Sequence, residues 1–384
     1  MTSSNGHVDN LVIGGGLAGA MVAQRLAAAG RSVTVLEKER SAHHKVCGEF
    51  LSREAVDYLR QVGVDPLALG AVSIRFVRLS SNRKVVESAL PFTALSLSRF
   101  ALDQAMLARA EESGCAVERG VFVEQLTSSE DLWLAQLRDR TTLCARTVFL
   151  ASGKHDLRGW PRPHRGQSDL VAFKLHWRLA AAQTCALRDF IELFVFPGGY
   201  GGLSLVEADQ ANLCLVVRQT RLRAVGGWDR LLASTLDGNR LMRQRLQGAT
   251  ALWPRPLALS SIPYGYLSSR PFGLWCVSDQ AAVIPSFTGD GMSIALHSAA
   301  LAAEMYLAGE SPDLYFRKLH QQLSRGMSLA TLLSRAMVTG VGRNLAPIAL
   351  SLLPNAMQWI ATSTRIPEQA RLGNPVPSLP RPSQ

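Results

Sequence analysis

The stretch NLVIGGGLAGAMVAQRLAAAGRSVTVLE, residues 10–37, decides which fold this chain of 384 residues adopts. A short apolar run ends at Ile13. An alanine-rich segment with helical spacing follows and stops at Gly30, a residue type that commonly ends helices. A second apolar run then closes on Glu37. The order of strand, glycine-rich turn, helix and strand predicts a parallel βαβ unit.

The glycines of the first turn have the spacing Gly14-x-Gly16-x-x-Gly19, which is typical of dinucleotide sites. Gly14 permits the tight turn, Gly16 lets a diphosphate approach the backbone, and Gly19 lets the helix pack close to the strand. The N-terminus of the helix offers free N–H groups and the positive end of its dipole. Glu37 is placed to accept hydrogen bonds from both hydroxyls of an adenosine ribose. The motif predicts a dinucleotide but does not separate FAD from NAD.

A second motif is SDQAAVIPSFTGDGMSIAL, residues 278–296, where a strand ends at Asp279 and an apolar helix opens after a turn. The Asp279 carboxylate can hydrogen-bond to a polyol chain. The N–H groups of Gly291 and Met292 can hold a carbonyl that gains negative charge, as a reduced flavin ring does. The alternative is an ordinary capped helix with Asp290 as its first-turn acid.

The remaining segments suggest how the chain is organised. Residues 96–114 predict a helix with Ser98 as its N-cap, and residues 171–220 predict an antiparallel meander. We therefore expect a mixed α/β (α+β) fold with a Rossmann-like dinucleotide-binding domain of discontinuous segments. The expected parts are the dinucleotide domain (1–75, 96–170 and 270–310), an inserted antiparallel-sheet substrate domain (76–95 and 171–269), a C-terminal helical segment (311–365) and a disordered tail (366–384).

Composition narrows the function classes. The 41 basic and 30 acidic residues give a net charge of +11, which favours an anionic partner such as a nucleotide cofactor or an acidic membrane surface. The basic residues are scattered without a nucleic-acid-binding motif, so no nucleic-acid partner is expected. Six scattered cysteines without a CxxC pair argue against a zinc site or a disulfide framework. Because the first ten residues lack a secretory signal, a cytoplasmic location is expected.

Three motifs occur in one order: VIGGGLAGA with VLEKE, SRFALDQAMLARAEESG near residue 100, and SDQAAVIPSFTGDGMSIAL near residue 285. In this respect residues 10–309 resemble FAD-dependent enzymes of the p-hydroxybenzoate hydroxylase and geranylgeranyl reductase superfamily. KVCGEFLS, residues 45–52, resembles the Cys-Gly stretch of geranylgeranyl-reductase-like members. VFPGGYGGLSLVE, residues 195–207, resembles their substrate-domain strands. The resemblance implies FAD as the cofactor.

The resemblance also implies roles for single residues. Arg99 would contact the FAD phosphates or ribose, Asp279 the ribitol, and residues 289–292 the pyrimidine edge of the ring. Cys47 would lie at the flavin or the substrate as a candidate catalytic thiol, or else be a small buried hydrophobe. Further cofactor contacts are expected at Leu17, Ala18, Lys38, Gly48, Val123, Gly289 and Asp290. Substrate-cavity residues are expected at Phe196, Tyr200 and Phe287.

The reaction type stays open between several alternatives. One is flavin-mediated hydride transfer to a bulky hydrophobic substrate, a prenyl, polyketide or aromatic compound. Another is a monooxygenase in which reduced flavin takes up O2, although ASGKHD, residues 151–156, replaces the Asp-Gly pair usual in such hydroxylases. A non-catalytic flavin- or lipid-binding module and a plain NAD dehydrogenase are the remaining alternatives. The single dinucleotide motif indicates that NAD(P)H, as the electron donor, would visit the flavin only transiently, unless a protein is the donor.

Three further segments of the sequence have less specific interpretations. Lys154, His155 and Asp156 are expected near the cofactor diphosphate or at an exposed crossover. His43 and His44 are expected in a solvated loop, and no metal site is predicted. Residues 344–366 are apolar but interrupted by prolines, so a membrane span is not expected. We expect ordinary packing, or else a C-terminal helix that lies on a membrane surface or lines a cavity. The oligomeric state is open.

Overall fold

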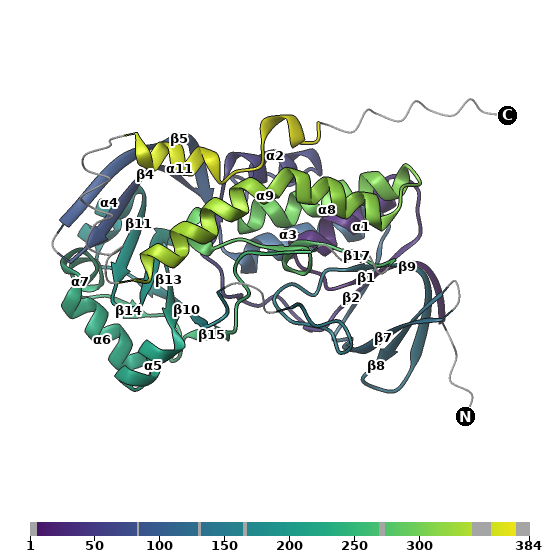
Figure 1. The fold of residues 1–384 in the computed structure, drawn as a ribbon, viewed down its shortest axis with the longest axis horizontal. Coiled ribbons are helices and arrows are strands. Elements are labelled where there is room, and N and C mark those ends of the chain that lie inside the picture. Colours follow the sequence, from purple (N-terminus) through teal and green to yellow (C-terminus); the bar gives the residue numbers. More distant parts are fainter. Residues whose placement is uncertain are drawn as a thin grey trace.

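The computed structural model describes residues 6–82, 84–129, 132–163, 167–268, 273–339 and 355–373. Two β-sheets lie side by side along the long axis of the molecule, and helices cover them (Figure 1). The purple first strands of the chain lie in the sheet nearer to the two termini. The teal middle of the chain builds most of the other sheet. The expected fold class, mixed α/β with a discontinuous first domain, is confirmed.

The first sheet contains the predicted βαβ unit. Its strand order is β6 (Ala116–Arg119), β2 (Val33–Glu37), β1 (Gly6–Ile13), β9 (Thr142–Leu150), β8 (Leu132–Leu137) and β7 (Val123–Ser129), with β17 (Trp275–Cys276) beside the end of β9. Strand β1 pairs in parallel with β2 and β9, and β17 pairs in parallel with β9. Three parts of the sequence therefore meet in one sheet, and the carboxyl ends of β1, β2 and β17 lie at the same edge.

Three helices pack together beside this sheet. They are α1 (Leu17–Ala28), α3 (Arg99–Glu112) and α8 (Gly291–Leu307), and α1 contacts both of the others. Their buried surfaces are rich in alanine, for example Ala20, Ala23, Ala299 and Ala303. Small side chains let the helix axes approach closely. As predicted, Ser98 caps α3, because its hydroxyl accepts the N–H of Ala101 at 3.1 Å.

The second sheet is the inserted one. Its order is β14 (Thr250–Ala251), β10 (Leu170–Arg178), β13 (Ala211–Arg218), β12 (Gly199–Leu205), β11 (Asp189–Phe196), β4 (Val72–Ser81), β5 (Lys84–Ser96) and β3 (Phe50–Leu51), with β15 (Leu257–Ser260) beside β10. Strands β11 to β13 form an antiparallel meander, but β11 pairs in parallel with β4. That parallel pair joins residues 72–96 to the later insert and makes the sheet mixed.

The two faces of the second sheet have different neighbours. Helices α4 (Ala181–Leu187), α5 (Gln219–Val225), α6 (Trp228–Gly238) and α7 (Arg240–Leu246) cover the outer face. Phe196 packs there with Leu213 and Val217. Side chains alternate along a strand, so the neighbouring Val195 points to the inner face. Phe196 is therefore not in the cavity expected from the sequence, but on the opposite side of its own sheet.

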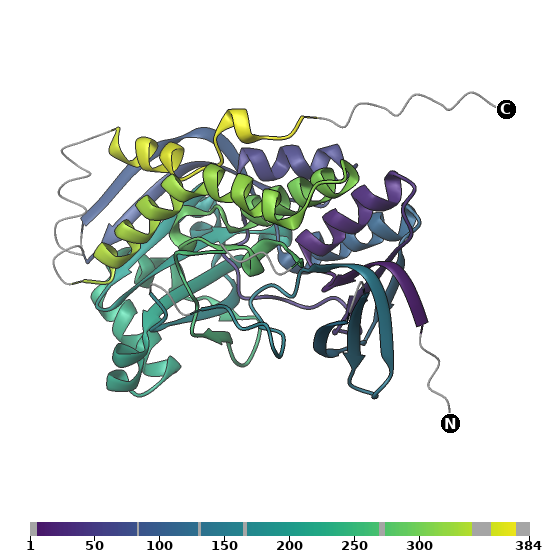
Figure 2. The same cartoon turned by 45° about the vertical axis from the view of Figure 1, so that its right-hand side comes forward.

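The C-terminal helices lie across both sheets. Helix α9 (Pro312–Met337) runs beside α8 and onward to the second sheet, where α11 (Ala356–Ser363) packs on β5 (Figures 1 and 2). Residues 366–373, expected in the disordered tail, are instead packed, because Ile366 and Ala370 are buried and Arg371 binds Glu54. Residues 340–354, part of the predicted helical segment, and the proline-rich residues 374–384 lie outside the described residues.

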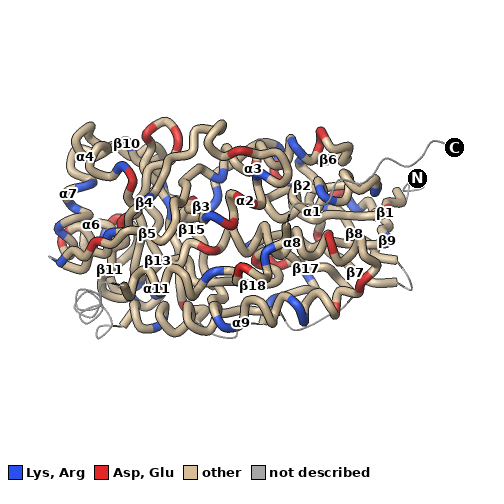
Figure 3. The backbone as a smooth tube through the Cα atoms, turned by 90° about the horizontal axis from the view of Figure 1, so that it is seen from above, with Lys and Arg blue, Asp and Glu red and all other residues tan. Residues whose placement is uncertain are grey.

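The charged residues and the helix lengths bear on possible partners. Figure 3 shows basic and acidic residues interspersed along the described chain, so the positive charge is not concentrated on one element. Among the described residues, no helix is both long and apolar enough to cross a membrane.

Candidate functional site

One cavity of about 970 Å³, called the central cavity below, is bounded by both sheets. The β1–α1 turn and the end of β2 form one end. The inner face of the second sheet and the helices α9 and α11 form the other end. This volume is at the upper end of the range for ligand sites, which suits a large ligand or two ligands together.

The first end has the steric features of a dinucleotide cradle. Gly14 has a φ of +107°, and a Cβ there would lie 2.5 Å from the carbonyl oxygen of Ala151. A Cβ on Gly19 would lie 1.8 Å from the carbonyl oxygen of Gly14, so the helix approaches its strand as the motif predicts. Gly16 precedes α1 and has no side chain with which to cap the helix. The first N–H groups of α1, beside Leu17 and Ala18 on the cavity wall, therefore remain for a ligand.

Two cations stand next to this helix terminus. A Cβ on Gly16 would lie 3.3 Å from Nζ of Lys45 and 3.6 Å from a guanidinium nitrogen of Arg99. Both cations bind Asp103, at 2.9 and 2.7 Å. Burial opposes the ionisation of Asp103, but Arg99 and Lys45 hold its pKa below the ordinary value. Two fixed cations at a helix N-terminus suit a diphosphate.

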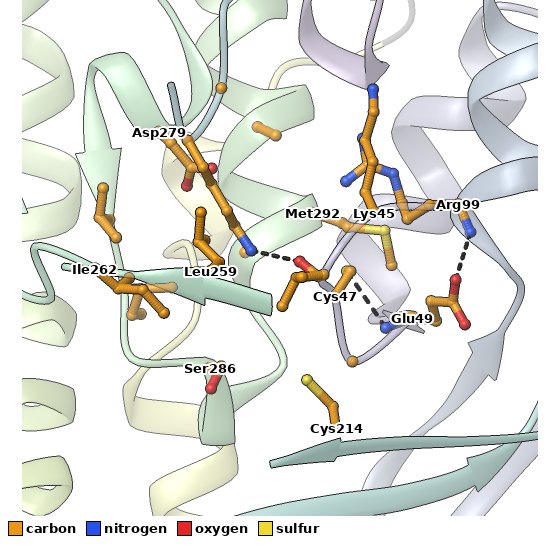
Figure 4. A pocket seen from close by; sticks show the side chains of 18 of the residues that line it. Lys45, Cys47, Glu49, Arg99, Cys214, Leu259, Ile262, Asp279, Ser286 and Met292 are labelled. Carbon is orange, nitrogen blue, oxygen red and sulfur yellow. Dashed lines mark hydrogen bonds between the residues drawn. The ribbon is translucent and has the colours of Figure 1, made fainter. Parts of the chain in front are cut away.

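Lys45 is a site residue that sequence motifs do not identify. It is the first residue of the Cys-Gly stretch, residues 45–52, but lies outside any phosphate-binding pattern. Figure 4 places it beside Arg99, on the far side of the cavity from Ser286.

Glu37 stands at the end of β2, where the ribose was expected. Its carboxylate accepts the N–H of Gly15 at 2.7 Å and that of Glu39 at 3.0 Å, which fixes its orientation. Lys38 and Val123 also line the cavity near this end. These contacts keep a carboxylate at the edge of the cradle, although part of its acceptor capacity is already used by the backbone.

The loop that carries Cys47 lies between the two sheets. Cys47 and Gly48 line the cavity, and the sulfur of Cys47 accepts the N–H of Glu49 at 3.3 Å (Figure 4). Asn212 on β13 donates to the carbonyl oxygen of Cys47 at 3.1 Å. Lys154 donates to the carbonyl oxygen of Val46 at 2.5 Å. The loop is thus held from both sides, and Cys47 faces the cavity.

Beneath this loop lies a buried cluster of charged groups. Glu49 is buried at a φ of +59°, and its carboxylate binds the ammonium of Lys174, Nε2 of His176 at 2.8 Å and the N–H of Arg99 at 2.8 Å. Burial alone would raise the pKa of Glu49, but Lys174 and His176 lower it below its ordinary value. These partners come from a distant strand, β10, so no local sequence pattern marks the cluster.

His44 joins this cluster and is not in the solvated loop expected from the sequence. It is partly buried between the rings of Phe100, at 5.1 Å, and Trp253, at 4.5 Å. Burial, with nearby Lys174, lowers its pKa to about 4. The ligand atoms of His44, Glu49 and His176 lie within 4.8 Å of one another. However, the ammonium of Lys174 already binds the carboxylate, and its charge would repel a metal ion.

The segment after β9 turns out to be a hydrogen-bonded turn. Arg162 binds Asp156 at 2.6 Å and the carbonyl oxygen of Lys154 at 2.8 Å. Gln280 donates to the carbonyl oxygens of Gly153 and His155. Lys154 and Asp156 thus have separate partners and do not form a catalytic trio with His155, although all three line the cavity.

The start of α8 forms the next part of the wall. Asp279, Gly289, Gly291 and Met292 line the cavity as expected. Asp290 does not. Its buried carboxylate accepts from Thr364 at 3.0 Å and pairs with Arg365 at 3.1 Å, and burial raises its pKa. Asp290 therefore ties the C-terminal segment to α8 and is not part of the cavity wall.

The far end of the cavity is apolar. Tyr200 and Phe287 line it, as expected. The other apolar residues of this end are Val77, Leu79, Leu90, Ile191, Leu193, Val195, Leu259, Ile262, Leu333, Met337, Met357 and Ile360. Helices α9 and α11 close this end, so α11 matches the cavity-lining alternative considered for residues 344–366.

Comparisons with known proteins point to FAD as the cofactor. A family model described as an FAD binding domain matches residues 7–149. Menaquinone reductase of Mycobacterium tuberculosis is 26% identical over 345 residues, which cover 85% of this chain and 83% of that protein. The flavin-dependent brominase Bmp2 has a similar structure, with a TM-score of 0.76, 16% identity and coverage of 95% and 96% of the two chains.

The halogenase PltM, in complex with phloroglucinol and FAD, is also similar, with a TM-score of 0.72, 13% identity and coverage of 94% and 89%. At such identities the two halogenating enzymes show a shared fold and no more. The matched FAD binding domain coincides with the cradle around Gly14, Gly16 and Gly19. The chain is therefore an FAD-dependent oxidoreductase, and its match to the FAD binding domain agrees with the resemblance to the p-hydroxybenzoate hydroxylase superfamily.

Proposed function

We propose that this protein is a flavin-dependent reductase of a bulky apolar molecule of the prenylated quinone class, the class named in its menaquinone reductase relatives. Reduced FAD, when bound in the cradle, would supply a hydride to one carbon of a C=C bond of the substrate, and a proton from water would complete the addition at the other carbon. The observation that carries the proposal is the continuity of the central cavity, which reaches from the cradle at Gly16 to the apolar walls of the second sheet and α11.

We assign the cofactor contacts as follows. The N–H groups of α1, with Lys45 and Arg99, hold the diphosphate, and Glu37 holds the ribose. Asp279 contacts the polyol chain. Gly291 and Met292 face the ring edge from the N-terminus of α8, whose dipole favours a negative ring. The side chain of the residue before α8, Asp290, binds Thr364 and Arg365, so it does not cover these N–H groups.

The substrate side of the proposal depends on burial of apolar surface. Side chains of β4, β11, α9 and α11 face the cavity and offer no charge along that stretch. A buried CH₂ group contributes about 0.8 kcal/mol, so a prenyl chain that fills this end gains affinity with each carbon. Cys47 lies between the two ends, where it would contact the flavin or the reacting part of the substrate.

NAD(P)H is the proposed electron donor, although the chain carries a single dinucleotide motif. A nicotinamide would therefore bind transiently at the cavity and leave before the substrate reacts. The reductase is preferred to a monooxygenase because the relatives that match over 85% of the chain are named reductases. The absence of the Asp-Gly pair after β9 in the sequence supports the same choice.

We also propose that α9 and α11 meet a membrane surface from which the substrate enters. Their inner residues Met337 and Ile360 line the cavity. On the same two helices, Leu332 is 66% exposed and Trp359 is 60% exposed. Exposed large apolar side chains beside an apolar cavity suit a peripheral contact with lipid, and the net positive charge favours an anionic surface.

The test is a reduction without oxygen. The holoenzyme is reduced with NADH or NADPH, freed of excess donor, and mixed anaerobically with a prenylated quinone while the flavin absorbance is followed. We expect the oxidised flavin spectrum to return and the product to gain two hydrogen atoms by mass spectrometry, a gain that persists after any quinol has been reoxidised in air. A product that gains an oxygen atom only when O2 is present would identify a monooxygenase. A bound flavin that neither nicotinamide reduces would favour a binding module.

A further inference from the structure

Three hydroxyl groups from separate segments meet on the apolar half of the central cavity. The hydroxyl of Tyr264 donates to Oγ of Ser286 at 2.8 Å, and Tyr200 and Ser286 share a second hydrogen bond of 3.2 Å. Tyr200 belongs to β12, Tyr264 follows β15, and Ser286 starts the short 3₁₀ helix η3 (Ser286–Thr288) that leads to α8. All three residues line the cavity.

The surroundings of this hydroxyl cluster are apolar. Val216, Ile262 and Leu259 pack around it, with Phe287 and Met337 at its border. A polar group in such surroundings costs free energy unless it is hydrogen-bonded. A wall that only contacts an apolar chain would therefore cost less free energy if it consisted of apolar side chains. The neighbouring strand β11 is an example, because its Val195 lines the cavity.

The count of protons shows what the cluster can offer. Three hydroxyls carry three protons, and the two bonds within the cluster use two of them. The third O–H group can donate between Tyr200 and Tyr264, which interact directly, or to an acceptor outside the cluster. Ser334 on α9, which itself donates to Gln167, interacts with Tyr200 and can take this bond. A ligand oxygen in the cavity can take it in place of Ser334.

The cluster is a neutral donor. Burial raises the pKa of Tyr200, and burial with the neighbouring Tyr200 raises that of Tyr264 well above the ordinary value, so both phenols stay protonated. Figure 4 places Ser286 on the side of Leu259 and Ile262, away from Lys45 and Arg99.

The cations of the cavity wall have other partners. Lys45 and Arg99 stand at the cradle assigned to the FAD diphosphate. Arg365 is paired with Glu54 and Asp290, and Lys154 donates to the carbonyl oxygen of Val46. Among the residues that the structure describes, no charged side chain hydrogen-bonds to the hydroxyl cluster.

We propose that the Tyr200–Ser286–Tyr264 cluster binds an uncharged oxygen acceptor, such as a quinone carbonyl, on the head of an otherwise apolar substrate. It thereby selects such a substrate over a prenyl diphosphate and over a plain hydrocarbon of the same length. A carbonyl needs only a neutral donor, whereas a diphosphate needs cations to offset the loss of its hydration. The inference rests on the proposed function and names the part of the cavity that recognises the head.

The experiment measures binding without turnover. Oxidised holoenzyme, with no reductant present, is titrated with a short-chain prenylated quinone, with the same chain as a hydrocarbon and with the same chain as a diphosphate. The flavin absorbance change gives each Kd. We expect Tyr200→Phe and Ser286→Ala to weaken quinone binding about tenfold, the effect of one hydrogen bond, and to leave hydrocarbon binding unchanged.

Tyr266→Phe is the matched control. Tyr266 belongs to the same apolar cluster but does not line the cavity, so its loss should change none of the three Kd values. FAD content and the thermal midpoint verify that each variant is folded. Tyr264→Phe tests the cluster a second time, through the donor of the shorter bond.

Two results would overturn the inference: an equal loss of quinone and hydrocarbon affinity in the variants, or tighter binding of the diphosphate than of the quinone by the unsubstituted protein. The proposed function fails separately, when reduced enzyme does not reduce the quinone although the binding preference is intact. Conversely, the variants could bind the quinone as tightly as the unsubstituted protein while the enzyme still reduces it. The proposed function would then stand, but the hydroxyl cluster would not be the site that binds the head.

Discussion

The ammonium of Lys154 lies 2.5 Å from the carbonyl oxygen of Val46, and this bond ties the end of the first sheet to the loop that carries Cys47. The same loop is held from the second sheet by Asn212. The position of Cys47 in the central cavity therefore depends on both sheets, and disturbing either anchor should change the cavity at the flavin.

Replacing Lys154 with Met should loosen this loop. A hydrogen bond from a charged donor contributes about 1.5–3 kcal/mol, so we expect FAD to bind at least about tenfold more weakly. Cys47 should also react faster with a small alkylating reagent. Lys84→Met, at an exposed lysine of β5, is the control. Unchanged FAD affinity and unchanged alkylation would show that the anchor is unimportant.

Two glycine substitutions in the cradle should have different effects. In Gly16→Ala the new methyl group lies near the flexible end of Lys45, so the protein should fold but bind FAD at least about tenfold more weakly, since the methyl occupies the diphosphate position. In Gly19→Ala the methyl group meets the backbone of Gly14 at 1.8 Å, so folding itself should suffer. Equilibrium dialysis and thermal unfolding separate the two, and full FAD affinity in Gly16→Ala would contradict the cradle.

The stability of the protein should fall as the pH is lowered from about 6.5 to about 4. The pKa of His44 is lowered to about 4 in the folded state, so the unfolded chain, with a pKa near about 6.5, binds the proton better in that window. Stability is full above the window and is lost through it. In the same direction, the lowered pKa of Glu49 stabilises the fold above its unfolded pKa of about 4.3 and less below it.

His44→Phe should make the stability of the protein less dependent on pH between about 6.5 and about 4. Phe keeps the ring packing against Phe100 and Trp253. It also removes Nδ1 of His44, which is buried without a hydrogen-bond partner among the described residues. Urea unfolding at several pH values compares the free energy of unfolding of the variant with that of the unsubstituted protein. At neutral pH we expect the variant to be equally stable or more stable. A pH profile identical to that of the unsubstituted protein would exclude His44 as its source.

Filling the α11 end of the cavity should shorten the accepted substrate. Ile360→Trp places a larger side chain on a cavity-lining position. We expect kcat/KM to fall at least about tenfold for a long prenyl chain and to change little for a short one, since the lost burial is about 0.8 kcal/mol per CH₂. FAD content should not change. An equal loss of kcat/KM for both prenyl lengths would show that the prenyl chain does not reach the α11 end of the cavity.

Membrane contact can be tested at the two exposed side chains of α9 and α11. The double variant Leu332→Ser with Trp359→Ser should sediment less with vesicles of anionic phospholipid and keep its activity on a short-chain substrate in solution. Leu67→Ser, at a residue that is 47% exposed outside these helices, is the control. If the unsubstituted protein, the double variant and the control bind vesicles equally, α9 and α11 do not form the membrane contact.

The sequence by itself determined the local parts of the site. The glycine spacing requires the turn between β1 and α1, because a Cβ at Gly14 or Gly19 would meet backbone atoms. Ser98 caps α3, and residues 289–292 lie at the start of α8, since caps and turns depend on neighbouring residues alone. Phe196 was misplaced because periodicity along a strand separates its two faces but does not say which one faces the cavity.

Only the tertiary structure decided which distant segments meet. Glu49 finds Lys174 and His176 on β10, and Tyr200 and Tyr264 meet Ser286, because strand order and pairing register bring these positions together. The C-terminal segment closes the cavity for the same reason, through Arg365 at Asp290. Such contacts depend on how the two sheets pack, which no short window of residues encodes, and they turn a dinucleotide-binding motif into a site with a substrate cavity.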